Sequence, residues 1–368
     1  MTISIASPDP ISSAPARFFG LLRSTVAGVG SQVARVLRNV TERVEILVRG
    51  GREVASDVDV VPAVRAQPTA VVDGPETGTG LATPGTAASL RTARILSVVV
   101  AVAMVLASAV GLWWRGLYQD PASAVAMFRG YDLVSLAVAT PLLAAALTRA
   151  RQGSPRAQLL WAGMLAYAVY TYSYYVFGAA LNALLLVHVV LLVQSAVALV
   201  LVLRNLDIAG IADGFDERTP VRSVAAVLGF LAAGLGGMWI YNSLRSAVTG
   251  AALPQGVLVQ PAPILRLGYV LDLATLVPGY AGSAWLLWRR RTWGYVLAAV
   301  LLTASGVIQL DYMSALLFQA AAEVPGATPY DPQEPFIAAA IGAAAAVLLA
   351  NLRPVRQDDA ATALRVLS

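Results

Sequence analysis

Few side chains in this 368-residue sequence could bind a ligand, and most of them lie within long apolar stretches. An ionisable group inside a membrane-spanning segment is costly when it faces lipid, so such groups normally point into a helix bundle and mark binding sites. We therefore predict a ligand-binding site without catalytic residues. Its seven candidate residues are Asp132, Tyr170, Tyr174, Asn182, His188, Asp272 and Asp311.

The three carboxylates have different alternative explanations. Asp311 is the best candidate because it lies beside Gln309 and Tyr312 in an apolar stretch. An interfacial carboxylate reached by water is the alternative for this residue. Asp132 and Asp272 begin apolar stretches, where a carboxylate stabilises the positive end of a helix dipole. Helix capping is therefore the alternative interpretation for both.

A dense run of tyrosines occupies the end of one apolar stretch, at Tyr167, Tyr170, Tyr172, Tyr174 and Tyr175. Helical spacing places Tyr167, Tyr170 and Tyr174 on one face and the other two on another, so they cannot all line one cavity. Aromatic residues are enriched at membrane boundaries, so we expect one face to anchor at the interface and one to meet the ligand. Tyr170 and Tyr174 are the candidates for ligand contact.

His188, the single histidine, and Asn182 lie near the start of the next apolar stretch. A lone membrane histidine more often hydrogen-bonds between helices than takes part in catalysis, and a proton relay is the alternative. These two residues and the three aspartates fall in the half of the bilayer that the arginine distribution places away from the cytoplasm. Their common depth predicts a polar vestibule that opens outward.

The residue types that are missing exclude several kinds of site. All 26 basic residues are arginine, no cysteine occurs, and there is one histidine. Without lysine there is no Schiff-base cofactor, and without cysteine there is no thiolate metal site or thiol nucleophile. A single histidine also excludes a two-histidine metal or haem site within one chain. We therefore expect no cofactor and no metal ion.

The elements that position these side chains are apolar, since 58% of the residues are hydrophobic and 13% are charged. A helix of about 20 apolar residues crosses the ~30 Å hydrocarbon core, where only closed hydrogen-bonding structures are tolerated. We predict an all-α, polytopic membrane helix bundle in residues 94–353 and a cytoplasmic tail in residues 354–368. The eight expected spans are 95–114, 132–148, 157–176, 181–203, 222–243, 266–288, 293–317 and 336–352.

Arginine is concentrated in alternate loops between these spans, at 149–156, 204–222, 289–291 and 353–356. Cytoplasmic loops of membrane proteins carry the positive excess, so we expect both termini in the cytoplasm. An odd number of spans would break the alternation. Arginine in place of lysine, with abundant alanine, valine, glycine and leucine, is typical of a GC-rich bacterial genome. We therefore expect a protein of the bacterial cytoplasmic membrane.

Three segments precede the bundle: a disordered N-terminus (1–15), an amphipathic helix (16–50) and a flexible linker (51–93). Apolar residues recur at spacings of three and four in the second segment, which is the period of one helix face. Its basic residues predict contact with anionic lipid headgroups rather than nucleic acid, and they are Arg17, Arg23, Arg35, Arg38, Arg43, Arg49 and Arg52. Alternatively, residues 16–49 pair with a second copy of the chain or with a protein partner.

The two halves of the membrane domain share a sequence pattern. Residues 129–132 and 266–272 both contain Arg, Gly, Tyr and Asp in that order, and a proline follows each, at Pro141 and Pro278. Four helices per half would relate the halves by an axis along the membrane normal, as in transporters built from parallel repeats. Chance similarity at helix entrances is the alternative to this 4+4 repeat.

Parts of the membrane domain resemble a group of uncharacterised multi-pass bacterial membrane proteins. The residues that carry this resemblance are the run from Tyr167 to Leu199, with Phe177-Gly178 and Asn182, and Asp272 with Pro278 before Trp293-Gly294-Tyr295. The resemblance covers mainly the membrane domain and implies no activity.

Three classes of function remain. Binding or transport of a small molecule or lipid through the outward vestibule is the leading hypothesis. A membrane scaffold that recruits partners through residues 16–49 is the second. A lipid-modifying enzyme, with His188 and an aspartate as base and orienting group, is the third, and no catalytic motif supports it.

Overall fold

The computed structural model describes residues 84–353, with side chains from residue 88 onward. Every regular element in this range is helical, and no β-strand occurs among these residues. The predicted disordered N-terminus, the amphipathic helix at 16–50, most of the predicted linker and the tail at 354–368 lie outside the described residues.

The helices follow one another along the chain, and two π-helical turns, η1 and η2, join helices end to end. In order, the elements are α2 (Pro84–Trp113), α3 (Ala122–Val134), η1 (Ser135–Ala139), α4 (Thr140–Ala150), α5 (Pro155–Phe177), α6 (Leu185–Arg204), α7 (Ile208–Asp213), α8 (Val221–Thr249), α9 (Ala262–Leu271), η2 (Asp272–Leu276), α10 (Val277–Trp288), α11 (Thr292–Ala321) and α12 (Glu334–Asn351). Pro141 and Pro278 follow the π turns by two positions. Because proline lacks an N–H and crowds the preceding turn, the helical ladder widens there.

Within residues 84–353, seven helices are long and apolar enough to cross a membrane. They are Ala88–Trp113, Ala122–Ala150, Leu185–Arg204, Val221–Thr249, Ala262–Trp288, Thr292–Ala321 and Glu334–Asn351. Large apolar side chains are exposed on their outward faces, including Leu186 at 76% and Phe230 at 74%. Such extensive apolar exposure is unfavourable in water and favourable in lipid. The helices therefore fit a multi-pass membrane protein.

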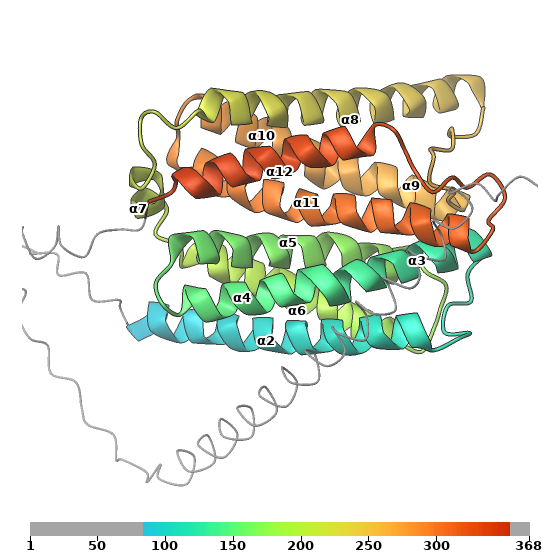
Figure 1. Cartoon of the computed structure of the whole chain (residues 1–368), viewed down its shortest axis with the longest axis horizontal. Helices are drawn as coiled ribbons and strands as arrows, with labels where there is room; N and C mark the ends of the chain where they lie inside the picture. The colour runs from blue at the N-terminus through green and yellow to red at the C-terminus, as the bar shows by residue number, and fades with distance from the viewer. Residues whose placement is uncertain (1–83, 354–368) are drawn as a thin grey trace, which may run out of the picture. The chain divides into compact units, whose positions relative to one another are not determined.

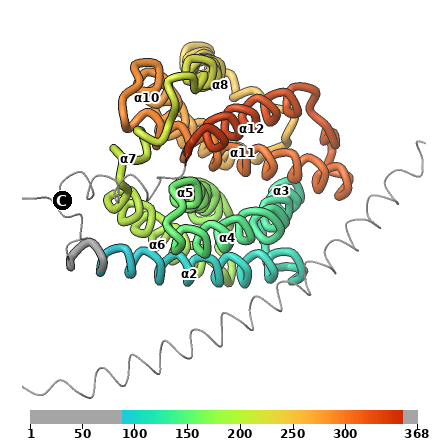
Figure 2. Tube along the Cα trace, turned by 60° about the vertical axis from the view of Figure 1, so that its left-hand side comes forward, coloured from blue at the N-terminus to red at the C-terminus, as the bar shows by residue number. Residues whose placement is uncertain are grey.

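Helices α5 and α11 lie at the centre of the bundle and pack against each other (Figure 1). α5 also contacts α4 and α6, and α11 also contacts α3, α10 and α12. α2 packs on α6 and α8 packs on α10, and Figure 2 shows α2 and α8 at opposite edges of the bundle. Fourteen of the 23 residues of α5 are buried. The other helices thus cover much of the surface of α5.

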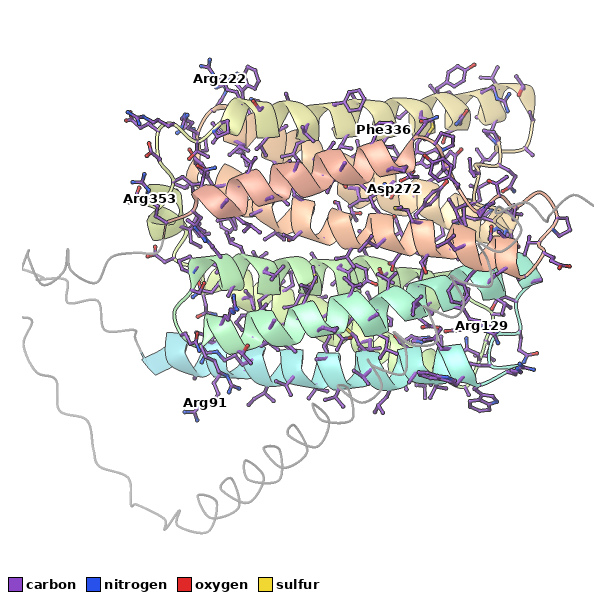
Figure 3. The ribbon with its side chains drawn as sticks, viewed as in Figure 1. Arg91, Arg129, Arg222, Asp272, Phe336 and Arg353 are labelled. Atoms are coloured by element: carbon purple, nitrogen blue, oxygen red, sulfur yellow. The ribbon has the colours of Figure 1, made fainter. Side chains whose placement is uncertain are left out.

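The two ends of the bundle are named here by labelled arginines. Arg91, Arg222 and Arg353 lie at one end, the Arg353 end, and Arg129 lies towards the other, the Arg129 end (Figure 3). The described arginines of the predicted basic loops lie in the terminal turns of helices or in the adjoining loops at the Arg353 end.

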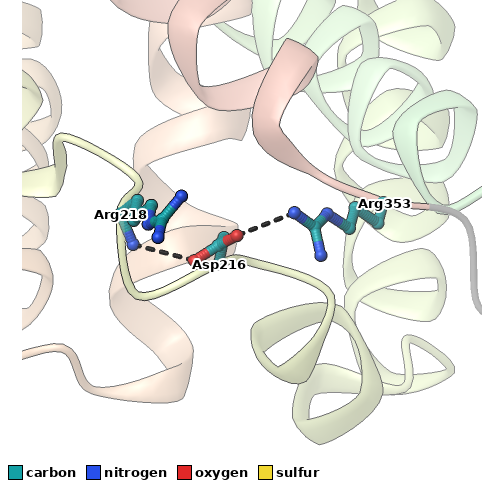
Figure 4. Close-up of polar contacts among 3 residues, drawn as sticks. All are labelled: Asp216, Arg218 and Arg353. Carbon is teal, nitrogen blue, oxygen red and sulfur yellow. Dashed lines mark hydrogen bonds and ion pairs between the residues drawn. The ribbon is translucent and has the colours of Figure 1, made fainter.

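A half-buried carboxylate, that of Asp216, connects segments at the Arg353 end (Figure 4). Its Oδ2 accepts a hydrogen bond from the Arg353 guanidinium (2.7 Å), and its Oδ1 accepts from the backbone N–H of Arg218 (3.0 Å). The Arg218 N–H and the nearby Arg353 and Arg218 side chains lower the pKa of Asp216 below its usual value. This contact ties the end of α12 to the loop before α8.

Two predicted spans begin later than the helices that contain them. The span predicted at 132–148 begins at Ala122, and the span predicted at 266–288 begins at Ala262. Arg129 and Arg266 therefore lie within helices and not in loops. A long arginine side chain near a helix end can reach the interface, so it does not have to end a span.

The linker predicted at 51–93 extends too far, because α2 already begins at Pro84. Ala93 is fully buried against the bundle, and the Asn205 amide donates a hydrogen bond to Oγ of Ser89 (2.9 Å). Small and polar residues in this stretch are typical of a linker. Here they form the first turns of a packed helix, because small side chains allow close contact between helices.

Candidate functional site

Three aspartates, Asp132, Asp272 and Asp311, lie at one depth in the bundle. Each is ten residues from the end of its continuous helix on the Arg129 side, or about 15 Å along the helix axis. All three are buried, with exposed fractions of 2%, 8% and 3%. Figure 3 shows Asp272 within the bundle. The carboxylates therefore share the half of the bundle in which the sequence predicts a vestibule.

The carboxylate of Asp132 on α3 lies between α2, the loop after α2 and α5. The Tyr118 hydroxyl donates to its Oδ2 (2.7 Å), and the Tyr175 hydroxyl donates to its Oδ1 (3.0 Å). Gly111 on α2 provides the space, since a Cβ there would lie 2.0 Å from Oδ2. Burial and the neighbouring Asp132 raise the pKa of Tyr118 well above its usual value. Tyr118 therefore keeps its proton and remains a donor at neutral pH.

Asp311 on α11 is held by two donors from α5. The hydroxyls of Tyr167 and Thr171 donate to Oδ1 and Oδ2, both at 3.1 Å. Tyr167 also shares a 2.8 Å hydrogen bond with Oγ of Ser135, the first residue of η1. Since the single hydroxyl proton of Tyr167 points to Asp311, Ser135 is the donor in that second bond. Asp311 is thus buried and bonded, and the interpretation as a water-exposed interfacial carboxylate is wrong.

Asp272 is the first residue of η2 and receives donors from α5 and α8. The Tyr170 hydroxyl donates to its Oδ1 (2.6 Å), and the Trp239 indole N–H donates to its Oδ2 (2.8 Å). The hydroxyls of Tyr170 and Tyr174 are 3.4 Å apart, and Tyr174 is the donor because the Tyr170 proton is already used. Capping does not explain Asp132 or Asp272, because both lie well inside continuous helices.

Helix α5 supplies a donor to each of the three carboxylates. Tyr167, Thr171 and Tyr175 follow one another at intervals of four residues, so they form a row along one side of the helix. Tyr170 and Tyr174 form a second row with the same interval. The first row donates hydrogen bonds to Asp311 and Asp132, and the second row donates to Asp272. The order of residues in α5 therefore organises the whole site.

The tyrosine face expected at the membrane interface is buried instead. Tyr172 and Tyr175 are each 1% exposed, and their ring centroids lie 5.8 Å and 4.6 Å from that of His188 on α6. Because α6 packs along α5, lipid does not reach this face. Among the described residues, neither ring nitrogen of His188 nor the Tyr172 hydroxyl has a hydrogen-bond partner. His188 thus packs beside the site without binding a carboxylate.

Asn182 makes no hydrogen bond with the three carboxylates, and its described partners are local. Its Oδ1 accepts from the N–H of Leu184 (2.9 Å), and its Nδ2 donates to the carbonyl of Ala180 (3.0 Å). The N–H of Ala180 in turn donates to Oδ1 of Asp120 (2.8 Å), whose pKa is raised by burial. Asn182 therefore shapes the turn between α5 and α6.

A close helix crossing lies next to two of the carboxylates. A Cβ on Gly130 of α3 would lie 2.7 Å from the backbone N and Cα of Ala315 on α11. Asp132 and Asp311 are two and four residues from these positions, which is about one helical turn or less. The crossing therefore holds the Asp132 and Asp311 sections of the bundle together.

The side chains that donate hydrogen bonds to these carboxylates are all neutral. Among residues 88–353, the one nitrogen–oxygen ion pair within 4.0 Å joins Arg353 to Asp216, so Arg129 does not pair with Asp132. In the same range, no three His, Asp or Glu side chains cluster closely enough to hold a metal ion. Removing an ionised carboxylate from water without a compensating charge is unfavourable by several kcal/mol. The site can therefore accept positive charge, as a proton or as a cationic group.

Five donors to the carboxylates are absent from the seven candidates chosen from the sequence: Tyr118, Tyr167, Thr171, Tyr175 and Trp239. The four-residue interval between Tyr167, Thr171 and Tyr175 is a signal that could identify three of them. Tyr118 and Trp239 are 14 and 33 positions from the aspartates they contact, and no local pattern links them.

No family model, curated protein or solved structure matches this chain. Its function is therefore inferred from the geometry of the site. The feature that needs an explanation is a set of three buried carboxylates ordered by α5 and lacking a described cationic partner.

Proposed function

We propose that this protein binds and transports a small molecule or lipid, using the three buried carboxylates as its binding or coupling site. The observation that carries this proposal is that Asp132, Asp272 and Asp311 are each held by two neutral donors, with no cationic side chain within 4.0 Å among residues 88–353. Neutral polar residues could supply purely structural hydrogen bonds at a much lower energetic cost. Intramembrane carboxylates are typical of proton relays and ion pathways.

The chemistry of the site favours a ligand that brings positive charge. A proton or cationic group entering from the Arg129 end would neutralise a carboxylate whose oxygens are already oriented by tyrosines. A protonated carboxyl gains an O–H donor and keeps only part of its acceptor capacity, so protonation weakens the hydrogen bond that a hydroxyl donates to the protonated oxygen. For Asp311 this change reaches η1 directly, because Tyr167 also contacts Ser135. Charge at the site is thereby connected to a π-helical turn, an irregularity frequent at functional sites.

In this proposal α5 is an eighth membrane span. Its 23 residues cover about 34 Å, enough for a ~30 Å hydrocarbon core. It is not among the seven apolar helices because its tyrosines and other polar residues lower its hydropathy. Figure 1 shows α5 alongside α4 and α11 in the bundle. With eight spans, the arginine-rich loops share one side, which supports cytoplasmic termini in a bacterial cytoplasmic membrane.

The proposal also includes a parallel repeat of four helices in each half. Three pairs of elements begin 137 positions apart: α2 and α8 (84 and 221), η1 and η2 (135 and 272), and α5 and α11 (155 and 292). Packing follows the same correspondence, since α5 contacts α4, α6 and α9 while α11 contacts α10, α12 and α3. These relations support an axis along the membrane normal that passes between α5 and α11.

The test is the thermal stability of the purified full-length protein in mild detergent, compared between wild type and Asp311→Asn. Monovalent cations, alkylammonium ions, their neutral analogues and lipids serve as the panel. A ligand that binds the folded state raises apparent stability by mass action. We expect at least one positively charged compound to stabilise the wild type and not Asp311→Asn.

Asp216→Asn is the matched control, because it removes a carboxylate that lies in a loop at the Arg353 end. This variant should respond to the panel as the wild type does. An equal response of the wild type and Asp311→Asn to every compound would contradict the proposed role of Asp311.

The scaffold hypothesis and the lipid contacts at Arg17–Arg52 concern residues outside the described range. Deletion of residues 16–49 tests both, since a scaffold or homo-oligomer would then lose its partner while the bundle persists. The enzyme hypothesis has less support. A general base needs an orienting partner, and the His188 ring nitrogens have no hydrogen-bond partner among the described residues.

A further inference from the structure

Two exposed arginines at the Arg353 end lie against tryptophan rings of α10. Cζ of Arg289 is 5.0 Å from the ring centroid of Trp285, and Cζ of Arg222 is 5.8 Å from that of Trp288. Trp285 and Trp288 are three residues apart, so they share one face of α10. Arg222, from the first turn of α8, and Arg289, directly after α10, therefore lie over one strip of the surface.

Neither of these guanidinium groups has a described acceptor. Within residues 88–353, no carboxylate lies within 4.0 Å of Arg222 or Arg289. The neighbouring Arg290 differs, because it donates to the carbonyls of Glu217 (2.8 Å) and Thr219 (3.4 Å). Each guanidinium carbon lies over a tryptophan ring at a distance typical of a cation–π contact, and such a contact uses no hydrogen-bond acceptor. The N–H donors of Arg222 and Arg289 are therefore available to an anion.

The tryptophans place these donors at the depth of lipid headgroups. Trp285 and Trp288 are 56% and 54% exposed, and the nearby Trp293 is 42% exposed. Exposed tryptophans concentrate at the membrane–water interface, where the ring contacts the upper acyl chains and the indole N–H meets the headgroups. Figure 3 shows Arg222 pointing away from the bundle at this end.

We propose that Arg222 and Arg289 bind the phosphate of an anionic phospholipid whose acyl chains lie along α8 and α10. Arginine donors match phosphate oxygens in charge and geometry. Residues 216–222 and 289–291 contain five arginines and two carboxylates, so this surface favours a headgroup with net negative charge over a zwitterionic one. The exposed rings beside the arginines favour a lipid over free phosphate. This site is separate from the three buried carboxylates and does not depend on their function.

The test measures phosphatidylglycerol binding by the full-length protein in nanodiscs of phosphatidylcholine with increasing phosphatidylglycerol content. Bound lipid is counted by native mass spectrometry for the wild type and for the double variant Arg222→Gln/Arg289→Gln. We expect the apparent affinity to fall at least about tenfold, because two charge-assisted contacts are lost. Both side chains are exposed, so the double variant should keep the wild-type melting temperature in pure phosphatidylcholine.

The matched control is Arg115→Gln/Arg245→Gln, which removes two exposed charges at the Arg129 end. It should retain wild-type affinity, and an equal loss would show a bulk charge effect and overturn the proposal. Unchanged lipid binding in Arg222→Gln/Arg289→Gln would also overturn it. In a third arm, inorganic phosphate competes with the lipid. Effective competition at the lipid's own concentration would identify a free-anion site, whereas failure to compete supports a lipid site.

Discussion

Helices α5 and α11 occupy the same central place in the bundle but differ in composition. α11 has 30 residues and is apolar enough to be recognised as a span, with a mean hydropathy of 1.6 in its most apolar window. α5 has 23 residues, carries five tyrosines and does not reach that hydropathy. The donors come from α5, and α11 provides the acceptor Asp311. Other helices surround both α5 and α11, so the lower hydropathy of α5 comes from the polar side chains it carries and not from its central position.

The contact between these two helices is expected to be the most sensitive part of the comparison. Gly163 on α5 lies against α11, where a Cβ would be 1.9 Å from Oγ1 of Thr303 and 3.2 Å from the carbonyl oxygen of Val300. Gly163→Leu should lower the free energy of unfolding by about 3 kcal/mol, because a close-packed core resists added volume. Chemical unfolding in mild detergent measures the change.

Gly237→Leu on α8 is the control for added volume, since no heavy atom lies within 4 Å of a Cβ built at Gly237. It should change the free energy of unfolding by less than about 1 kcal/mol, as expected at an open position. Equal losses for Gly163→Leu and Gly237→Leu would show that α5 and α11 are not in close contact.

Tyr167→Phe tests the hydrogen bond between α5 and α11. This change leaves Oδ1 of Asp311 without its donor and removes the partner of Ser135, in a position that is fully buried. We expect a loss of about 2 kcal/mol in the free energy of unfolding, because buried polar atoms lose their hydrogen bonds. Tyr241→Phe, at a side chain 66% exposed, is the matched control and should be close to neutral. A neutral Tyr167→Phe would mean that α5 does not order Asp311.

The smallest effect is expected at Asp216, in the loop between α7 and α8 at the Arg353 end. Its folded-state pKa is lowered, so its contribution to stability is present above the unfolded pKa of about 3.9 and is lost as the pH falls through the folded value. Asp216→Asn should therefore differ slightly from the wild type in melting temperature at pH 7 and converge with it in acid. A difference that grows on acidification would contradict the assigned contacts.

The positions of most helices follow from local patterns in the sequence, but several boundaries do not. Apolar runs identify the stretches that become α2, α6, α8, α11 and α12. The sequence predicts a span that begins at residue 132, because arginine at position 129 is typical of a loop. The helix begins at Ala122 and includes Arg129. Whether an arginine ends a span depends on the depth its side chain can reach, which is set by tertiary packing.

The sequence identifies the three aspartates that accept hydrogen bonds in the site, but it does not identify most of the side chains that donate to them. Aspartates in apolar stretches stand out because lipid makes them costly. Their partners depend on how α5 is rotated against its neighbours, and this rotation also decides that Tyr172 and Tyr175 are buried instead of interfacial. Trp239 of α8 donates a hydrogen bond to Asp272 of η2, and this contact forms only when the two helices pack together. Asn182, chosen for its depth, bonds locally and serves a turn.

Infrared spectroscopy of the carboxyl groups tests whether the buried carboxylates accept positive charge. Difference spectra of the reconstituted wild type and Asp311→Asn are recorded on acidification and on addition of each cation of the panel. We expect a carboxylate band of the wild type to change, either into the carbonyl stretch of a buried carboxylic acid or by a cation-induced shift. This change should be missing in Asp311→Asn. Identical difference spectra for the two proteins under every condition would contradict it.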